Sequence, residues 1–228
     1  MPFPALQRVV RRLAFAILAV LPIMAVADGQ LRPLPDPQMD MAKGADVRQS
    51  AVFAGGCFWG VQAVFQQLKG VVSATSGYAG GALKSPSYEQ VSLGDTGHAE
   101  SVQVAYDPHQ ISYGQLLKVF FAVAHDPTEL NRQGPDSGTQ YRSAVFATTA
   151  EQQRVAAAYI RQLESDHVFG SPIVTEVSRL SAFYPAEAYH QNYVARHPDS
   201  FYVRINDLPK LVHLQQTFPQ LLKPEGKS

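Results

Sequence analysis

The sequence predicts one domain of the α/β or α+β class, with a mixed β-sheet flanked by helices. Three observations support this prediction. The composition is that of an ordinary globular protein, since 46% of the 228 residues are hydrophobic and 17% are charged. From Ser50 onward, short apolar runs alternate with longer amphipathic stretches. The chain has no internal repeat and no low-complexity tract.

The first 27 residues are organised like a secretory signal. Three arginines precede an apolar stretch from Leu13 to Met24, and Ala25-Val26-Ala27 supplies the small residues that favour cleavage. The stretch has about 12 residues, fewer than the ~20 that a membrane-spanning helix needs. Arg11-Arg12 is only a weak twin-arginine signal. We expect cleavage after Ala27 and a periplasmic or secreted protein, with an uncleaved membrane anchor as the alternative.

The charge balance excludes a strongly basic surface for nucleic acid. The chain has 19 Lys+Arg and 19 Asp+Glu, and removal of the signal takes away three arginines and no acid, which leaves a formal charge of −3.

Residues 28–49 contain Pro33, Pro35 and Pro37 among small and polar residues. Proline disfavours both helix and central strand, so we expect an extended linker there, followed by the domain at residues 50–228.

The domain is expected to begin with a strand and a helix. The apolar run at residues 51–54 is bounded by Gly55-Gly56, which predicts a buried strand that ends in a tight turn. An apolar stripe with helical spacing follows, and Lys69-Gly70 closes it. The stripe consists of Val61, Val64, Phe65 and Leu68. Cys57 is therefore expected at the junction between strand and helix.

The remaining elements continue the alternation. Strands are expected at residues 71–78, 101–106, 142–148 and 173–180. One helix is expected after Ser112, with an apolar stripe from Leu117 to Ala124. Another should run from Thr149, where Gln152 completes a capping box, to about Ser165. Two shorter helical segments are expected at residues 185–194 and 209–217.

Two long connections, residues 79–100 and 125–141, fit neither a helix nor a strand pattern. They are rich in Gly, Pro, Asp and Ser, yet they also carry aromatic, acidic and imidazole side chains. Loops of this length in a compact domain are usually functional or disordered, and disorder would leave the aromatic rings in water. We therefore expect the chemistry among Tyr88, His98, Glu100, His125, Asp126, Asp136 and Tyr141.

Cys57 is the only cysteine, which excludes an intramolecular disulfide and a Cys-x-x-Cys metal or redox pair. At a helix N-terminus the free N–H groups and the helix dipole should lower its pKa and favour the thiolate. Gly55, Gly56 and Gly60 allow the backbone to approach a ligand closely. The alternative is a small buried hydrophobic residue, which is the commonest fate of a free cysteine.

Phe58 and Trp59 directly follow this cysteine. Successive residues of a helix point in different directions, so the two rings cannot both belong to the stripe that starts at Val61. We expect at least one ring to be exposed near the sulfur. It would form either an apolar pocket wall for a small methyl group or a surface aromatic covered by a loop.

At this point the sequence resembles the A-type methionine sulfoxide reductases, the peptide-methionine (S)-S-oxide reductases. The matching motifs follow one another in the family's order and span roughly residues 50–198. They are Gly56-Cys57-Phe58-Trp59-Gly60, Ser76-Gly77-Tyr78-Ala79-Gly80-Gly81, Pro86-Ser87-Tyr88-Glu89, Gly97-His98-Ala99-Glu100, His125-Asp126-Pro127-Thr128, residues 133–143 from Gln133 to Ser143, and Tyr184-Pro185-Ala186-Glu187 followed by Tyr189-His190-Gln191. The family fold is similar to a two-layer α/β sandwich, an α+β fold around a mixed sheet.

The resemblance implies a role for each matching residue. Cys57 would attack the sulfoxide sulfur and become a sulfenic acid, while methionine departs. Glu100 would be the catalytic acid, and Tyr88 and Tyr141 would hydrogen-bond the sulfoxide oxygen. The substrate would be bound by Phe58, Trp59 and Asp136. The expected function is reduction of methionine S-sulfoxide, free or in proteins, as repair after oxidative damage.

The chemistry explains why such a site needs an acid. A sulfoxide oxygen is a poor leaving group until it is protonated, so the acid must keep its proton near neutral pH. Desolvation by surrounding rings would raise the pKa of Glu100 toward that range, and the two phenols would stabilise charge on the oxygen. Judged without the resemblance, Glu100 is a surface carboxylate before a strand, and Tyr88 and Tyr141 are ordinary half-buried aromatics.

Many members of the family carry further cysteines that resolve the sulfenic acid, often in a C-terminal tail, and this tail has none from Leu211 to Ser228. An external thiol must then reduce Cys57. We expect no cofactor and no metal, oxidised proteins or peptides as substrates, and a thioredoxin-like reductant maintained across the membrane as partner. Membrane contact is expected only through an uncleaved signal segment.

Two other functions stay open. A cysteine hydrolase would pair Cys57 with a histidine base, and His98, His125 and His190 are the candidates. None of the three has a distinctive spacing from Cys57, so we expect them to make hydrogen bonds that brace loops. A non-catalytic exported module would instead bind methionine-rich segments through Phe58 and Trp59.

Overall fold

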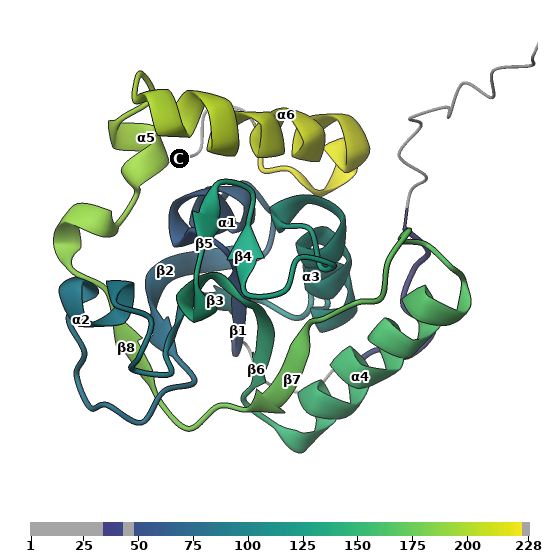
Figure 1. The fold of residues 1–228 in the computed structure, drawn as a ribbon. Coiled ribbons are helices and arrows are strands. Elements are labelled where there is room, and N and C mark those ends of the chain that lie inside the picture. Colours follow the sequence, from purple (N-terminus) through teal and green to yellow (C-terminus); the bar gives the residue numbers. More distant parts are fainter. Residues whose placement is uncertain (1–33, 43–47, 225–228) are drawn as a thin grey trace, which may run out of the picture. The chain divides into compact units, whose positions relative to one another are not determined.

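The computed structural model describes residues 34–42 and 48–224, and a six-stranded sheet forms the centre of this part (Figure 1). Its strands are β1 (Gln49–Gly55), β2 (Val71–Ala79), β3 (Ala99–Tyr106), β6 (Ser143–Ala147), β7 (Glu176–Arg179) and β8 (Phe183–Pro185). They lie in the order β7-β6-β1-β3-β2-β8. Neighbouring strands are antiparallel except β6 and β7, which are parallel. The sheet is therefore mixed, and the predicted class is confirmed.

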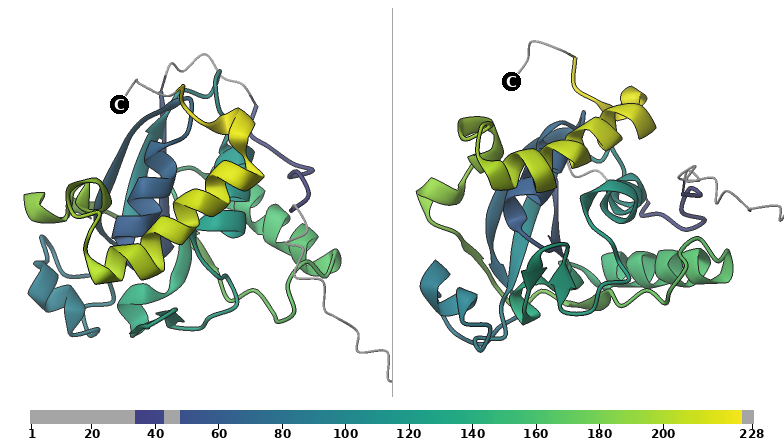
Figure 2. Two further views of the ribbon diagram at one scale, coloured as in Figure 1. Left: turned by 90° about the horizontal axis from the view of Figure 1, so that it is seen from above. Right: turned by 45° about the horizontal axis from the view of Figure 1, so that its top comes forward.

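Four longer helices lie on one side of the sheet, and the last of them packs on the first and not on the strands, as Figure 2 shows from two further directions. They are α1 (Phe58–Gln66), α3 (Tyr113–Val119), α4 (Ala150–Ser165) and α6 (Leu208–Thr217). Short helices are α2 (Tyr88–Ser92) and α5 (Tyr193–Arg196), and single turns are η1 (Phe120–Ala124), η2 (Thr139–Tyr141), η3 (Ala188–His190), η4 (Val203–Asp207) and η5 (Pro219–Leu221). None of the helices within the described ranges is long and apolar enough to cross a membrane.

The two faces of β1 show why the molecule has two layers. Side chains alternate along a strand, so Ala51 and Phe53 point to the helices while Val52 and Ala54 point to the other face. The helical face holds the main core, in which Phe53 stacks on Phe65 of α1 with 5.0 Å between ring centroids. The other face holds a small cluster of alanines with Val52 and Phe146.

Part of the expected linker lies against the domain. Residues 34–42 contain neither helix nor strand, and Leu34 is buried in the main core. Tyr159 of α4 donates its hydroxyl hydrogen to the Pro35 carbonyl at 2.8 Å. Asp40 accepts a hydrogen bond from the backbone N–H of Gly114 in α3 at 2.8 Å. The predicted signal segment, residues 1–27, lies outside the described residues.

Most expected elements lie where the sequence placed them, but residues 185–194 do not form the predicted helical segment. Phe183–Pro185 is instead the edge strand β8, which pairs with the end of β2. The reason is local, because a residue before proline is pushed to extended backbone and proline is tolerated on an edge strand. Only a single turn at Ala188–His190 and the four-residue α5 follow.

The two long connections also contain short elements that the sequence reasoning missed. Residues 79–100 include α2, where Ser87 and Gln90 form a capping box. Residues 125–141 include η2 and a small hairpin of β4 (Arg132–Gln133) and β5 (Asp136–Ser137). At α4, Thr149 caps the helix as expected, but the Gln152 side chain accepts from the Thr148 N–H, so the predicted capping box is only half formed.

Candidate active site

Cys57 lies at the N-cap position of α1, directly after the turn that ends β1. Gly56 in this turn has φ +82°, and a Cβ there would lie 2.5 Å from the Gln133 side chain, so the turn requires glycine. The Cys57 side chain makes no cap hydrogen bond and is 9% exposed. The predicted strand-to-helix junction is confirmed, and the sulfur lies just below the surface.

Glu100 lies beside this helix start. It belongs to β3, where it pairs with Tyr78 of β2, and only 3% of it is exposed. Its Oε2 accepts a hydrogen bond of 3.1 Å from the backbone N–H of Phe58, the residue after the cysteine. Burial raises the pKa of Glu100 to about 8, and this hydrogen bond only partly opposes the rise. The carboxyl therefore keeps its proton near neutral pH, as the sequence reasoning required of an acid.

The expected low pKa of Cys57 is wrong for the resting site. Burial raises the pKa of the thiol well above its ordinary value, and the charges of Glu100 and Asp207 raise it further. The Trp59 backbone N–H lowers it, but less. Desolvation outweighs the helix dipole because the sulfur lies inside the site and not at an open helix end. The resting residue is a thiol.

The two predicted phenols come from separate loops. Tyr88 is the first residue of α2, and Glu187 fixes it by accepting its backbone N–H at 2.9 Å. Tyr141 ends η2. Burial and then the charge of Glu100 raise the pKa of each phenol, and Cys57 adds a smaller rise to both. Both hydroxyl groups therefore stay protonated and lie within the electrostatic reach of acid and thiol.

Phe58 and Trp59 differ in exposure. Phe58 is 1% exposed, so this ring is fully buried, while Trp59 is half-buried and is the exposed member that the sequence reasoning expected. The Trp59 indole stacks on Tyr193 with centroids 3.7 Å apart. Its N–H donates to Nδ1 of His190 at 3.1 Å. Two side chains thus hold the indole in one orientation at the site.

Asp136 is held by a partner that sequence reasoning did not select. It lies in β5 and accepts a short hydrogen bond from the hydroxyl of Tyr202, which comes from the segment before η4. Burial raises the pKa of Tyr202, and the negative charge of an ionised Cys57 is the next cause. The hairpin and the C-terminal segment therefore meet near the sulfur.

Three further residues of the site were missed or given another role. His190 holds the indole, Glu187 holds α2, and Asp207 is a buried carboxyl of η4. The motif from Tyr184 to Gln191 marked the first two as worth examining. Asp207 lies in no motif and far along the chain, so only the tertiary structure could place it.

The other two candidate histidines brace loops, as the sequence reasoning favoured. Nδ1 of His98 accepts from the Gly81 N–H at 3.2 Å, and its Nε2 lies 2.8 Å from the Leu83 carbonyl. His125 contacts the Phe120 carbonyl and Ser143. Burial lowers the pKa of His125 to about 3, so it stays neutral.

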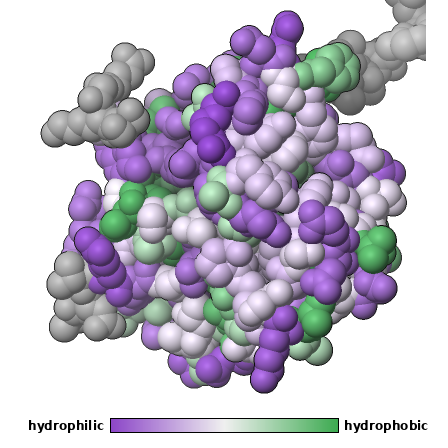
Figure 3. All heavy atoms as spheres, turned by 90° about the vertical axis from the view of Figure 1, so that its left-hand side faces the viewer, coloured by the Kyte–Doolittle hydropathy of each residue, from purple (hydrophilic) through white to green (hydrophobic). Residues whose placement is uncertain are grey.

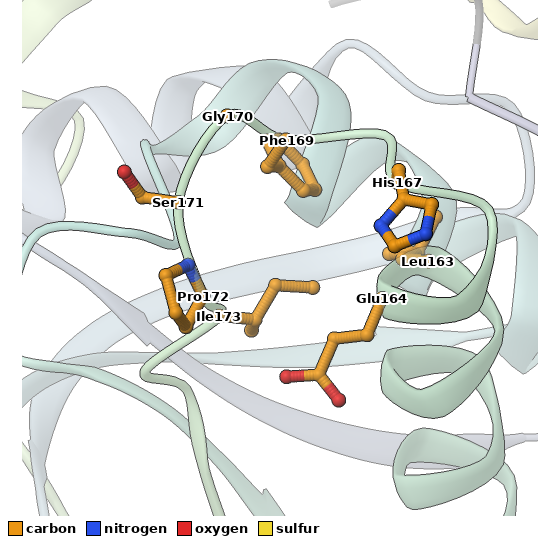
Figure 4. A pocket seen from close by; sticks show the side chains of 8 residues that line it. All are labelled: Leu163, Glu164, His167, Phe169, Gly170, Ser171, Pro172 and Ile173. Carbon is orange, nitrogen blue, oxygen red and sulfur yellow. The ribbon is translucent and has the colours of Figure 1, made fainter.

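The described residues also form pockets that lie apart from the predicted site residues. A pocket of about 320 Å³ lies at the end of α4, between Leu163 and Ile173 (Figure 4), and none of the predicted site residues lines it. The described ranges contain no cluster of three or more His, Cys, Asp or Glu that could hold a metal. On the face shown in Figure 3, hydrophobic residues form small separate groups among hydrophilic ones.

Comparison with known proteins points to the same chemistry. The family model described as peptide methionine sulfoxide reductase matches residues 49–221. Peptide methionine sulfoxide reductase MsrA 2 of Synechocystis sp. is 52% identical over 196 residues, which cover 85% of this chain and 92% of the relative. That of Mesorhizobium japonicum is 54% identical over 179 residues, which cover 78% and 92%.

Solved structures agree in fold. Mxr1 from Saccharomyces cerevisiae in reduced form is similar with a TM-score of 0.64 and 34% identity, over 70% of this chain and 91% of that one. Methionine sulfoxide reductase A of Corynebacterium diphtheriae has a TM-score of 0.59 and 33% identity, over 75% and 86%.

Proposed function

The chain belongs to the peptide methionine sulfoxide reductase family, and from this premise we propose how its residues carry out the reaction. The enzyme reduces methionine sulfoxide, which repairs oxidised methionine. We assign Cys57 as the nucleophile and Glu100 as the acid. The observation that carries the assignment is the 3.1 Å hydrogen bond from the Phe58 N–H to Glu100, which places a proton-bearing carboxyl one residue from the only thiol.

The proposed first half-reaction is a two-electron transfer between sulfurs. Cys57 Sγ attacks the sulfoxide sulfur, and Glu100 gives its proton to the sulfoxide oxygen. The oxygen passes to Cys57, methionine leaves, and the proton lost by the thiol restores Glu100. Thiol and sulfoxide thus become sulfenic acid and thioether: the Cys57 sulfur is oxidised and the substrate sulfur is reduced.

The neighbouring side chains fit this step. The hydroxyl groups of Tyr88 and Tyr141 remain protonated, so each can donate a hydrogen bond to the oxygen as negative charge develops there. The fixed, half-buried indole of Trp59 supplies the accessible apolar wall for the methyl group, and the buried ring of Phe58 supports the site by packing on His190. Asp136, which Tyr202 orients, binds the polar part of the substrate.

Resolution of the sulfenic acid must come from outside, because the chain has one cysteine. Two external thiols convert Cys57–SOH to the thiol with formation of one disulfide and one water molecule. We propose a thioredoxin-like dithiol domain as their source and the periplasm or cell exterior as the location. Equal turnover with a monothiol and with every dithiol tested would remove the reason for such a partner. Because we expect cleavage after Ala27, protein recovered outside the cytoplasm should have Asp28 as its N-terminal residue.

The deciding experiment uses the enzyme without reductant. The protein is incubated with each methionine sulfoxide epimer and then weighed. The S epimer should add one oxygen to Cys57 and release one equivalent of methionine, while the R epimer should do neither. An unchanged mass with both epimers would contradict the assignment.

The hydrolase alternative has no comparable support. The imidazoles of His98 and His125 are held by loop contacts, and that of His190 accepts the Trp59 indole N–H. A peptide acyl electrophile should therefore leave no acyl-enzyme on Cys57, and acylation without sulfoxide reduction would favour the hydrolase instead.

A further inference from the structure

Asp207 is a buried carboxyl that the reaction described above does not use. It is the last residue of η4 and directly precedes α6, and only 1% of it is exposed. Neither carboxyl oxygen has a hydrogen-bond partner among the described residues. Buried carboxyl groups are nearly always paired, so an unpaired one calls for an explanation.

The carboxyl lies against the first turn of α1. A Cβ added at Gly60 would lie 2.2 Å from Asp207 Oδ1 and 3.1 Å from its Cγ. Gly60 is the third residue of the helix, and its N–H is the one that an N-cap side chain normally accepts. Here the N-cap residue is Cys57, whose side chain accepts none. A carboxyl from the C-terminal region therefore lies beside the helix start at which a thiolate would be stabilised.

Two anions would compete for this helix start. The positive end of the α1 dipole stabilises one negative charge, but two like charges in a buried site repel each other strongly. Burial raises the pKa of Asp207 to about 6, and Lys210 opposes that rise, so above this pH the carboxyl carries the charge. Ionisation of the thiol then costs additional free energy.

We propose that Asp207 is a positioning residue that keeps the resting Cys57 in its thiol form. The other titratable groups that interact electrostatically with the sulfur or with this carboxyl are Glu100, Asp136, Lys210, Tyr88, Tyr141 and Tyr202. Lys210 is the cation among them, and it forms no ion pair with Asp207 in the described part of the chain. The negative charge of Asp207 therefore still disfavours ionisation of the Cys57 thiol, although Lys210 lies nearby.

The consequence, which rests on the proposed function, is selective reactivity. A thiolate reacts with alkylating agents and peroxide, whereas a thiol reacts slowly. A resting thiol is thus protected from unspecific oxidants. It is consumed only when a bound sulfoxide offers an electrophilic sulfur beside the proton of Glu100.

The test measures how fast iodoacetamide alkylates the protein as a function of pH. Cys57 is the only cysteine, so the mass gain reports this residue alone. Asp207→Asn should move the midpoint of the profile to lower pH by about one pH unit, so that alkylation at a fixed pH below both midpoints rises about tenfold. Asp199→Asn, an exposed acid of the same region, is the matched control and should leave the profile unchanged.

A second variant acts in the opposite direction and does not alter the buried carboxyl. Lys210→Met removes the cation that opposes Asp207, so the midpoint should move to higher pH, where Asp207 is ionised in both proteins. An unchanged or higher midpoint in Asp207→Asn, or an unchanged or lower one in Lys210→Met, would overturn the proposal. Alkylation requires no sulfoxide turnover, so a failure here is distinguishable from a failure of the reductase assignment.

Discussion

The first turns of α1 and α3 each follow a non-helical N-cap residue, but their backbone N–H groups are satisfied by different side chains. At α3, Ser112 accepts from the Gln115 N–H at 3.1 Å, and the Gln115 side chain accepts from the Ser112 N–H at 2.9 Å. Asp40 accepts a third N–H from the same turn. At α1, Cys57 caps nothing. The α3 turn is closed by its own capping box together with Asp40, whereas the α1 turn has no side-chain cap and its acceptor is Glu100 of β3.

The difference separates stability from reactivity. A capping serine typically contributes about 1 kcal/mol to the free energy of unfolding. The sequence of α1 forgoes such a cap, and Glu100 supplies an acceptor from β3 instead. We expect variants at α1 to change turnover and variants at α3 to change stability.

The largest expected effect is at Cys57 itself. Cys57→Ser should abolish turnover, because a hydroxyl cannot form the sulfenic acid. It should leave the free energy of unfolding at or above its original value, because serine is a preferred N-cap residue. Methionine release and urea unfolding measure the two quantities. Turnover retained in this variant would end the assignment.

Glu100→Gln comes next. The amide keeps an acceptor for the Phe58 N–H but has no proton to give, so turnover should fall about 10²- to 10⁴-fold. In the original enzyme, turnover should fall as pH rises through about 8, where Glu100 loses its proton. Glutamine does not titrate, so the residual activity of the variant should lack that decline. A decline shared by both proteins would exclude Glu100 as its source.

The phenols should have smaller effects. Tyr141→Phe and Tyr88→Phe each remove one hydrogen bond to the developing charge, worth about 1.5–3 kcal/mol, or roughly 10- to 150-fold in turnover. Tyr159→Phe is the matched control, because that hydroxyl bonds the Pro35 carbonyl in another part of the fold. It should lower stability and leave turnover unchanged. Equal turnover losses in all three variants would contradict the assigned roles.

The smallest effect on the reaction is expected at α3. Ser112→Ala should lower the free energy of unfolding by about 1 kcal/mol, because the Gln115 N–H loses its acceptor. Turnover per folded molecule should remain at its original value. A loss of turnover without a loss of stability would show that the two helix starts are not separated in function.

Local pattern was sufficient for most of the fold. The apolar run at residues 51–54 and the stripe that follows it define β1 and α1 because the signals for burial and for turn formation agree there. The edge strand β8 was not predicted because three residues give no usable period, and Pro185, its last residue, resembled a helix start. The five-residue α2 is too short to show an apolar stripe with helical spacing. Ser87 and Gln90, which form its capping box, were the sequence signal that could have predicted it.

The site was predictable only as far as local motifs extend. Glu100 and the phenols were selected because their motifs resemble those of a family. Burial raises the pKa of Glu100, which is the expected direction. The predicted low pKa of Cys57 was wrong because desolvation raises it. Desolvation depends on the side chains that pack over the sulfur, and the residues next to Cys57 in the sequence do not reveal them. Tyr202 and Asp207 are brought to the site by the C-terminal segment, so their contribution is a tertiary effect.

One feature of the site also makes the enzyme its own reporter. The chain has a single tryptophan, and it lies where the substrate methyl group is expected, stacked on Tyr193 and bonded to His190. Indole fluorescence therefore originates from this one location and from no other. Mixing the enzyme with sulfoxide in a stopped-flow fluorimeter should follow ligand arrival, oxidation of the sulfur and its later reduction as separate optical phases, without any attached dye.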